Sequence, residues 1–367
     1  MELSRSIFFK NDPSYREAAK RWPMALRPEF RENTFAMFHQ GQPVSTMGRV
    51  IRDFAVYGHI LRMGFIGGVC THPDHRGKGL AGTVLHASLQ RFVDLDVDFV
   101  YISGARPLYY RTGANHIGGL LQFLLTADAL KLVDSEGLTV RKATQNDVEV
   151  LHSLNESEET RLVHDLLDYE LVARHGHCSG GTCTFNLIES GAKPVAYVAV
   201  RNLSRKDDKW SQNVIEFAGD REAVLYALAK MANEHGPNGS IIVEMPPGEQ
   251  LASRLCSLGV ENKPSRMGGT VKVVNFTGTM EKLRPYFGSQ LGSSFAESLE
   301  FSTGIERYVI SGEGGALEID GESNMLWTLF SAPPGKESEN VRASGVMKKA
   351  LEVCLPIPIP ALGINNI

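Results

Sequence analysis

Apolar residues recur along the chain with two spacings, which predict a mixture of strands and helices. In the first third of the chain, short apolar runs predict strands at residues 34–39, 44–54, 60–71 and 99–102. Gly41-Gln-Pro43 separates the first two runs and indicates a hairpin. Between the last two runs, apolar positions at helical spacing predict a helix from Leu80 to Phe92, with Leu80, Val84, Leu85 and Leu89 on one face. A further helix is expected at residues 13–21, capped by Asp12.

The same order of elements recurs in the middle of the chain. Strands are predicted at residues 138–143, 185–188, 195–200, 214–218 and 241–245, and helices at residues 220–234 and 249–258. Thr144 and Asp147 have the spacing of a capping box at a helix start. The second set of elements therefore indicates a second copy of the first domain.

The last hundred residues follow a different pattern. We expect a strand at residues 270–275, a helix at 279–286 that Gly288 ends, and a helix at 343–353, with apolar runs at 308–310, 316–319 and 326–330. Three prolines make residues 355–360 extended, and an apolar end at 363–367 predicts a docked terminus. The domain boundaries are therefore predicted as 1–137, 138–269 and 270–367.

Composition excludes several classes of partner and site. The chain has 367 residues, a net charge of -4 and a pI near 6.3, so we expect no nucleic-acid partner and no anionic membrane surface. It shows no leader and no apolar run of about eighteen residues, which predicts a cytoplasmic protein. Five cysteines do not form a disulfide framework. His175, His177, Cys178 and Cys183 lack the second half of a metal site, so no metal is expected.

The stretch from Met63 to Phe92 carries the strongest chemical signal. An apolar strand leads through His72-Pro-Asp-His-Arg-Gly-Lys-Gly79 into the helix that begins at Leu80. Glycines allow consecutive N–H groups to point into one concavity, and a helix start and basic side chains add positive charge. The pattern predicts a site for a pyrophosphate.

Two common phosphate motifs do not fit this stretch. A P-loop needs Ser or Thr after Gly-Lys, whereas Gly79 follows Lys78 here. Gly77, Gly79 and Gly82 spell the dinucleotide fingerprint, but five residues separate the strand from the first glycine. The aspartates at positions 94, 96 and 98 also precede the next strand instead of ending it.

Arg76-Gly-Lys-Gly-Leu-Ala81 resembles the R-x-x-G-x-G/A signature of the GCN5-related N-acetyltransferase (GNAT) superfamily. The resemblance implies acetyl-coenzyme A as co-substrate, with a strand edge pairing with the pantetheine arm and the glycine loop holding the pyrophosphate. The implied cofactor-binding residues are Val69, Cys70, Thr71, Arg76, Gly77, Lys78, Gly79, Leu80, Ala81 and Gly82.

The second half of the superfamily pattern lies in residues 105–114. The superfamily places a tyrosine four residues before a glycine, near the cofactor's sulfur, and Tyr109 and Gly113 have this spacing. A phenol with a pKa of about 10 can return a proton to a leaving thiolate with a pKa of about 8.5. Tyr109 is therefore the candidate catalytic residue, with Tyr110 as the less favoured neighbour.

The reaction also needs a general base and a donor for the oxyanion. An attacking amine must lose a proton, and Glu29, Asp53, His59 and His72 are unranked candidates for the base. A backbone N–H near residues 69–71, freed by a strand bulge, is the expected oxyanion donor. We discount an acetyl-cysteine at Cys70, because no base partner is apparent.

The whole order of domains resembles the enhanced intracellular survival protein family. The resemblance implies an α/β (α+β) fold with two tandem acetyltransferase-type mixed-sheet domains, the second of them non-catalytic, and a small sterol-carrier-like domain. It also implies that the terminal carboxylate, here that of Ile367, reaches the active site as a base. The expected activity is direct N-acetylation of a small-molecule or side-chain amine, with a homo-oligomer left open. The alternatives are a silent coenzyme A- or lipid-binding protein and an enzyme that transfers longer acyl chains.

Overall fold

The computed structural model describes residues 2–8, 22, 32–130, 137–178, 180–202, 210–236, 239–359 and 362–365. The chain divides into two compact units. Unit 1 comprises Met1–Asp12, Arg31–Gly119 and Arg266–Ile359, and unit 2 comprises Pro13–Phe30, Leu120–Ser265 and Pro360–Ile367. The predicted mixed α/β class is confirmed. The helix expected at residues 13–21 lies outside the described residues, and the three predicted domain boundaries stay predictions.

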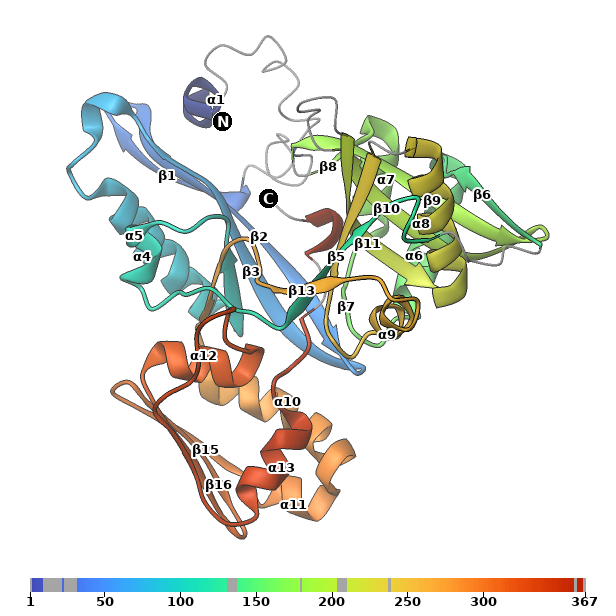
Figure 1. Cartoon of the computed structure of the whole chain (residues 1–367). Helices are drawn as coiled ribbons and strands as arrows, with labels where there is room; N and C mark the ends of the chain where they lie inside the picture. Colours follow the sequence, from blue (N-terminus) through green and yellow to red (C-terminus); the bar gives the residue numbers. More distant parts are fainter. Residues whose placement is uncertain are drawn as a thin grey trace. The chain divides into compact units, whose positions relative to one another are not determined.

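The first sheet of unit 1 carries the glycine-rich stretch. Its strand order is β1 (Thr34–His39), β2 (Gln42–Val56), β3 (His59–Thr71), β4 (Phe99–Ile102) and β14 (Thr270–Val273). β1, β2 and β3 form an antiparallel meander, β4 is parallel to β3, and β14 is antiparallel to β4. The predicted bounds of β1 and β4 agree with the structure. β14 enters this sheet from a distant part of the sequence (Figure 1).

The two faces of this sheet pack against different helices. α4 (Leu80–Asp94) buries Val84, Leu85, Leu89 and Phe92 in a core with Ile66, Val100 and Ile102. Alternation along β4 turns Phe99 to the other face, where its ring lies 5.2 Å from that of Phe330. α1 (Glu2–Phe8), which the sequence did not predict, and α5 (Pro107–Tyr110) complete this part.

Residues after β14 form helices around a second, four-stranded sheet of unit 1. The elements are α10 (Phe276–Leu291), α11 (Ser293–Glu297), β15 (Glu300–Gly304), β16 (Arg307–Gly312), β17 (Gly315–Asp320), α12 (Glu322–Phe330), β18 (Val341–Ala343) and α13 (Met347–Cys354). The prediction that Gly288 ends a helix is wrong, because α10 continues to Leu291. Buried contacts of Tyr286 and Phe287 on this helix outweigh the weak helix propensity of one glycine.

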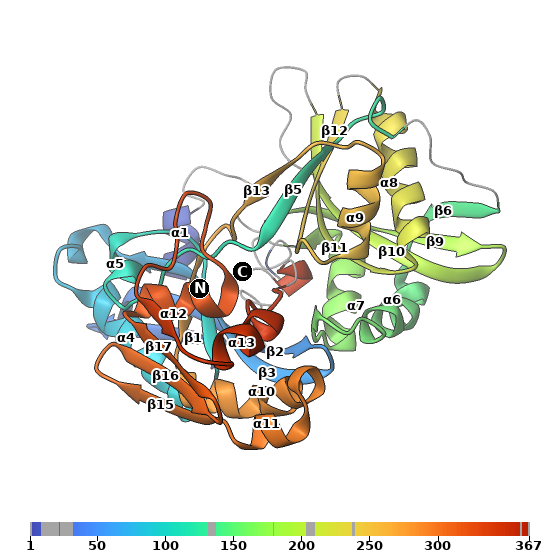
Figure 2. The ribbon, with the colours of Figure 1, turned by 60° about the horizontal axis from the view of Figure 1, so that its bottom comes forward.

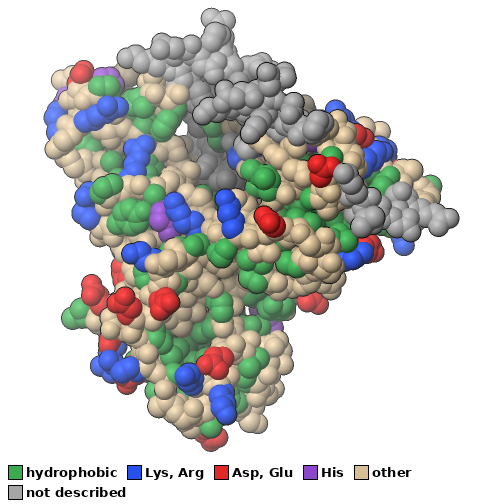
Figure 3. All heavy atoms as spheres, viewed as in Figure 1, with side chains coloured by type: hydrophobic (Ala, Val, Ile, Leu, Met, Phe, Trp, Pro, Cys, Tyr) green, Lys and Arg blue, Asp and Glu red, His purple; other side chains and the backbone are tan. Residues whose placement is uncertain are grey.

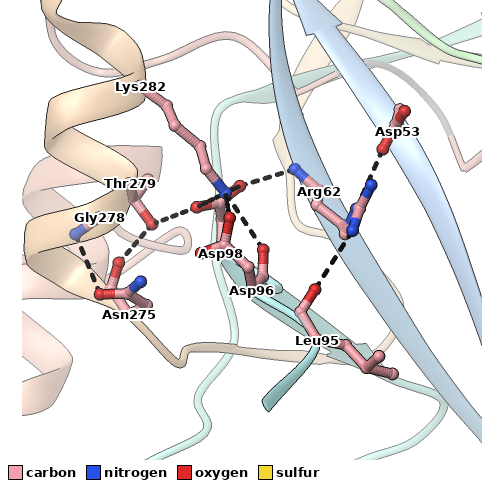
Figure 4. A network of polar contacts seen from close by, with 9 residues as sticks. All are labelled: Asp53, Arg62, Leu95, Asp96, Asp98, Asn275, Gly278, Thr279 and Lys282. Atoms are coloured by element: carbon pink, nitrogen blue, oxygen red, sulfur yellow. Dashed lines mark hydrogen bonds and ion pairs between the residues drawn. The ribbon is translucent and has the colours of Figure 1, made fainter. Parts of the chain in front are cut away.

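A buried carboxylate joins α10 to the first sheet. Asp98 is fully buried and accepts hydrogen bonds from the backbone N–H of Arg62 at 2.7 Å and from Thr279 at 3.2 Å. Lys282 Nζ lies 3.0 Å from both carboxylate oxygens of Asp98 (Figure 4). Burial raises the pKa of Asp98, and the hydrogen bonds from Arg62 and Lys282 partly offset that rise. The charge of Lys282 therefore compensates the desolvation of this carboxylate.

Unit 2 contains an eight-stranded sheet with helices on both faces. Its strand order is β13 (Asn262–Ser265), β5 (Leu120–Leu125), β12 (Gly239–Met245), β11 (Trp210–Gly219), β10 (Lys193–Asn202), β9 (Gly181–Ser190) and β6 (Leu138–Lys142), with β8 (His177–Cys178) paired to β9. Figure 2 shows β5 beside β12 and β13. α8 (Arg221–His235) and α9 (Gln250–Ser257) cover one face, and α6 (Val148–Glu156) and α7 (Leu166–His175) cover the other.

A buried polar network in unit 2 holds the described end of the chain. Glu216 on β11 pairs with His164 at 2.5 Å and accepts a hydrogen bond from Tyr197 at 2.6 Å. The N–H of Ile364 also donates to Glu216, and a side chain on Gly363 (φ 60°) would meet the same carboxylate. A backbone hydrogen bond to this buried carboxylate thus anchors the short 3-10 helix Gly363–Asn365. Ile367 lies outside the described residues.

We predict that Lys282→Met destabilises the protein by about 2 kcal/mol, because Asp98 keeps its burial but loses its counter-charge. Urea unfolding at pH 7 measures the change. The deficit shrinks as the pH falls, since the raised pKa of Asp98 favours the protonated acid. Lys348→Met on the exposed face of α13 is the control and changes stability by less than about 0.5 kcal/mol. Equal stability of the two variants would contradict the assignment.

Candidate active site

A cavity of about 540 Å³ in unit 1 lies where β3 passes into α4. Nine of the ten residues predicted to bind the cofactor line it. The cavity wall consists of Ile7, Phe8, Val69, Cys70, Thr71, His75, Arg76, Gly77, Gly79, Leu80, Ala81, Gly82, Arg106, Leu108 and Arg111. Lys78 is the predicted residue that the wall does not include. The structure thus brings the strand end, the glycine loop and the first turn of α4 to one space.

The glycine loop exposes a series of main-chain donors. Gly77 and Gly79 have φ values of 76° and 75°, a backbone region that favours glycine. Gly79 is the N-cap of α4 and contributes no side-chain cap. Among the described residues, none accepts a hydrogen bond from the N–H groups of residues 77–82, and the first helical bond runs from Thr83 N–H to Gly79. This arrangement suits an anion.

The base of the loop is held by its own hydrogen bonds. The N–H of His72 donates to the carbonyl of Val44 on β2 at 2.8 Å, and the N–H of Arg76 donates to Pro73 at 3.2 Å. Arg76 Nε also donates to the carbonyl of Thr71 at 3.3 Å. The donors of the loop are therefore positioned before any ligand binds.

β3 and β4 separate beside this cavity. Their parallel pairing ends at Ile66 and Ile102, while β3 continues to Thr71. No described strand pairs with that edge of β3 after Ile66. The unpaired edge can bind an extended ligand that carries amides, as an added strand would.

A bulge interrupts the pairing of β3 with β2 in the segment whose other edge is unpaired. Thr46 of β2 faces Cys70, but Gly48 faces Gly67, so β3 holds one extra residue between these pairs. Gly68 in this segment has a φ of 61°. The expectation of a bulge near residues 69–71 therefore agrees with the structure, and the role of its N–H in catalysis stays a prediction.

Tyr109 lies on α5, with a ring that is 1% exposed and packed in the core against α4. Burial raises the pKa of its phenol, and the charge of Arg106 acts in the opposite direction. The hydroxyl is thus held in its protonated form at neutral pH. Tyr110 is half-exposed and bonds His116 at 3.0 Å. The ring of Tyr109 does not line the cavity, although Leu108 beside it does.

The base candidates lie in different places. Asp53 and His59 are at the far end of the β2–β3 hairpin, and at about 3.3 Å per residue His59 is roughly 30 Å from the bulge. His72 follows β3 at the cavity end, and Glu29 and Ile367 lie outside the described residues. Cys70 lies in a buried group with Thr46 at 3.2 Å and Ser4 at 3.6 Å. The structure therefore brings neither Asp53 nor His59 to the cavity.

Sequence reasoning missed part of the cavity wall. Arg106 and Arg111 flank the tyrosines of α5, and Ile7 and Phe8 come from α1. Among the described residues, the wall includes three arginines and one histidine but no Asp or Glu. The two basic residues around Pro107–Tyr110 were a visible signal in the sequence, whereas nothing local indicated that α1 would reach this site.

The corresponding junction in unit 2 is filled by the protein's own side chains. The N–H of Gly219 donates to Glu158 at 2.7 Å. Arg221 at the start of α8 pairs with Glu158 and with Glu249, each at 2.6 Å. The carboxylate of Glu158 thus bonds an N–H donor at this junction, whereas the N–H groups at the junction in unit 1 have no acceptor among the described residues. The prediction that the second copy is non-catalytic stays a prediction.

Residues 1–117 match the family described as acetyltransferase (GNAT) domain. The chain carries a GNAT acetyltransferase domain. The superfamily resemblance predicted from the glycine loop is thereby confirmed, and the GNAT fold uses acetyl-CoA. A comparison with curated proteins found no matching sequence.

Solved structures resemble nearly the whole chain in fold. A GCN5-related N-acetyltransferase from Anabaena variabilis has 14% sequence identity and a TM-score of 0.66, covering 97% of this chain and 93% of that one. A probable N-acyltransferase from Enterococcus faecalis has 13% identity and a TM-score of 0.63, covering 98% and 94%. Eis1 from Mycobacterium abscessus has 11% identity and a TM-score of 0.55, covering 92% of each chain. At these identities the likeness shows the fold alone.

The described residues hold neither a cluster typical of a metal site nor a helix that could span a membrane. No group of three or more His, Cys, Asp or Glu side chains in the described part of the chain has the arrangement of a metal site. His177 instead bonds the backbone carbonyl of His175, and Cys178 and Cys183 are buried. Among these same residues, no helix combines the length and the apolar character needed to cross a membrane.

We predict that Gly79→Ala weakens coenzyme A binding at least tenfold, because a Cβ at φ 75° strains the loop by about 1–2 kcal/mol and displaces its N–H donors. Calorimetry with coenzyme A measures the affinity. Gly58→Ala is the matched control, since Gly58 has a φ of 80° in the turn between β2 and β3, with open space around it. Both variants lose similar stability, but the control keeps its affinity. Equal affinity of Gly79→Ala and Gly58→Ala would refute the cradle.

Proposed function

We propose that the GNAT domain transfers an acetyl group from acetyl-CoA directly to a primary amine of a small molecule or a side chain. The observation that carries the proposal is the continuous cavity that joins an unpaired strand edge to an uncapped helix start. Acetyl-CoA has amides along its pantetheine arm and a pyrophosphate beyond them, in that order. The family match of residues 1–117 supports the same reaction class.

Each part of the cavity has a role in this reaction. The N–H groups of residues 77–82 bind the pyrophosphate, and Arg76 adds its charge. The edge of β3 at residues 69–71 pairs with the pantetheine amides. An N–H at the bulge stabilises the negative charge that develops on the thioester oxygen. The sheet fixes the groups of β3, and the loop's own hydrogen bonds fix the donors before α4, so positioning contributes much of the rate.

The reaction needs two proton transfers, one to the leaving thiolate and one from the attacking amine. Burial raises the pKa of the Tyr109 phenol, which remains protonated. Its ring does not line the cavity, so its donation of a proton to the leaving thiolate is proposed on the superfamily pattern alone. The amine must be neutral when it attacks the carbonyl carbon of the thioester. The carboxylate of Ile367 is proposed as the group that takes its proton, on the family resemblance alone.

We expect the full chain to release coenzyme A thiol from acetyl-CoA when it is mixed with a panel of polyamines, aminoglycosides and lysine-containing peptides. A thiol-reactive dye measures turnover, and mass spectrometry locates the acetyl group on nitrogen. A parallel series with longer acyl-CoA esters tests the acyl group. No turnover with any amine, despite tight coenzyme A binding, would instead support a silent binding protein.

We predict that Tyr109→Phe lowers kcat about 100-fold and changes the KM for acetyl-CoA by less than about threefold, because the ring keeps its packing but loses the proton donor. Steady-state kinetics with the best amine measures both constants. Tyr110→Phe is the matched control and retains kcat, since its hydroxyl bonds His116. An unchanged kcat in Tyr109→Phe would remove this residue from the mechanism.

A further inference from the structure

Three imidazole rings lie together beside the cavity. The proposed reaction gives none of them a role in binding acetyl-CoA. His39 ends β1, His72 follows β3, and His75 ends the 3-10 helix η3 (Pro73–His75). The ring centroids of His39 and His75 are 5.1 Å apart, and those of His72 and His75 are 5.9 Å apart. His75 also lines the cavity next to Arg76. We call these three residues the histidine group.

The surroundings of His75 are predominantly basic. Lys78 faces it from the glycine loop, His39 from β1, and His72 and Asp74 from the segment after β3. Asp74 is 84% exposed, and its carboxylate lies 3.8 Å from His72 Nδ1. Figure 3 shows histidine and Lys or Arg side chains at this end of unit 1, where the loop between β3 and α4 turns in Figure 1. The site therefore offers more positive charge than its single carboxylate neutralises.

These neighbours act on the protonation of His75. Loss of hydration lowers the pKa of His75 first, the charges of Lys78, His39 and His72 lower it further, and Asp74 acts in the opposite direction. The imidazolium is thus disfavoured while the site holds no anion. A bound anion reverses this balance, because it interacts favourably with every cation in the group.

The proposed cradle takes the pyrophosphate of coenzyme A and assigns no partner to the cofactor's other anionic group. Its ribose carries a phosphomonoester, separate from the pyrophosphate, with a second pKa near 6 and close to two negative charges at neutral pH. An imidazolium binds such a group through short, charge-assisted hydrogen bonds. Histidine titrates in the same pH range, so the pairing responds to pH near neutrality.

We propose that His75, flanked by His39 and His72, binds the ribose phosphate of coenzyme A in a subsite separate from the main-chain cradle. The subsite rests on the proposed function, since it requires the cofactor to lie in this cavity. It makes cofactor selection depend on the phosphomonoester and couples cofactor binding to proton uptake by the histidine group.

The test compares coenzyme A with 3′-dephospho-coenzyme A, which lacks only that phosphate, by calorimetry on the full chain. At pH 6.5 the wild type prefers coenzyme A about tenfold, the size of one charged hydrogen bond. The preference falls toward about twofold at pH 8.5, because the imidazolium loses its proton. Titrations in two buffers of different ionisation enthalpy show proton uptake with coenzyme A and none with the dephospho form.

The His75→Asn variant loses most of the preference at pH 6.5 and binds the dephospho form within about twofold of the wild type. His39→Asn/His75→Asn removes the remainder. His86→Asn is the matched control, because His86 is an exposed residue of α4 outside the cavity wall, and it keeps the wild-type preference and proton uptake.

The outcomes separate the subsite from the proposed function. Equal binding of both nucleotides by the wild type overturns the subsite and leaves the cofactor site intact. Equal weakening of both nucleotides by His75→Asn also overturns it, since the residue would then act on the cradle. If the wild type binds neither nucleotide, the proposed function fails together with the subsite.

Discussion

The architecture of the site depends on main-chain polar groups that the fold leaves without internal partners. β4 ends at Ile102 while β3 continues to Thr71, and α4 begins at a glycine that supplies no side-chain cap. N–H and C=O groups in such positions must bond water or a ligand, since leaving them unpaired in a cavity is costly. Both sets line the same 540 Å³ space. One extended ligand with amides and a phosphate end can therefore satisfy them together.

The charge of the cavity wall differs in sign from the net charge of the chain. The chain is acidic overall, with a net charge of -4, yet the described residues of the cavity wall include three arginines and a histidine and neither Asp nor Glu. Field focusing in a cavity depends on these near residues and little on the distant surface. The strand-to-helix junction of unit 2 differs, because the carboxylate of Glu158 accepts hydrogen bonds from Gly219 and Arg221 there. The two junctions differ in whether a carboxylate of the protein occupies their N–H donors.

Local signals in the sequence predicted local structure well. The bounds of β1 and β4 and the capping box of Thr144 and Asp147 follow from apolar patterning and side-chain chemistry within a few residues. The glycine loop was recognisable because positive φ values restrict residue choice. Sheet membership was not predictable, since pairing of β14 with β4 and of β5 with β12 joins segments far apart in sequence. Contacts of α1, His39 and Arg111 with the cavity region have the same non-local origin.

The bulge in β3 has a consequence for side-chain direction. Successive strand residues face opposite sides of a sheet, so one extra residue between Gly67 and Cys70 inverts the facing of everything that follows up to Thr71. A single strand therefore presents one alternation to the hydrophobic core and the inverted alternation to the cofactor end. Deleting Gly68 would restore continuous pairing with β2 and keep Cys70 opposite Thr46, yet it would remove the backbone groups that the bulge frees from the ladder. Length at this one position, more than the identity of its neighbours, determines which atoms the strand offers to a ligand.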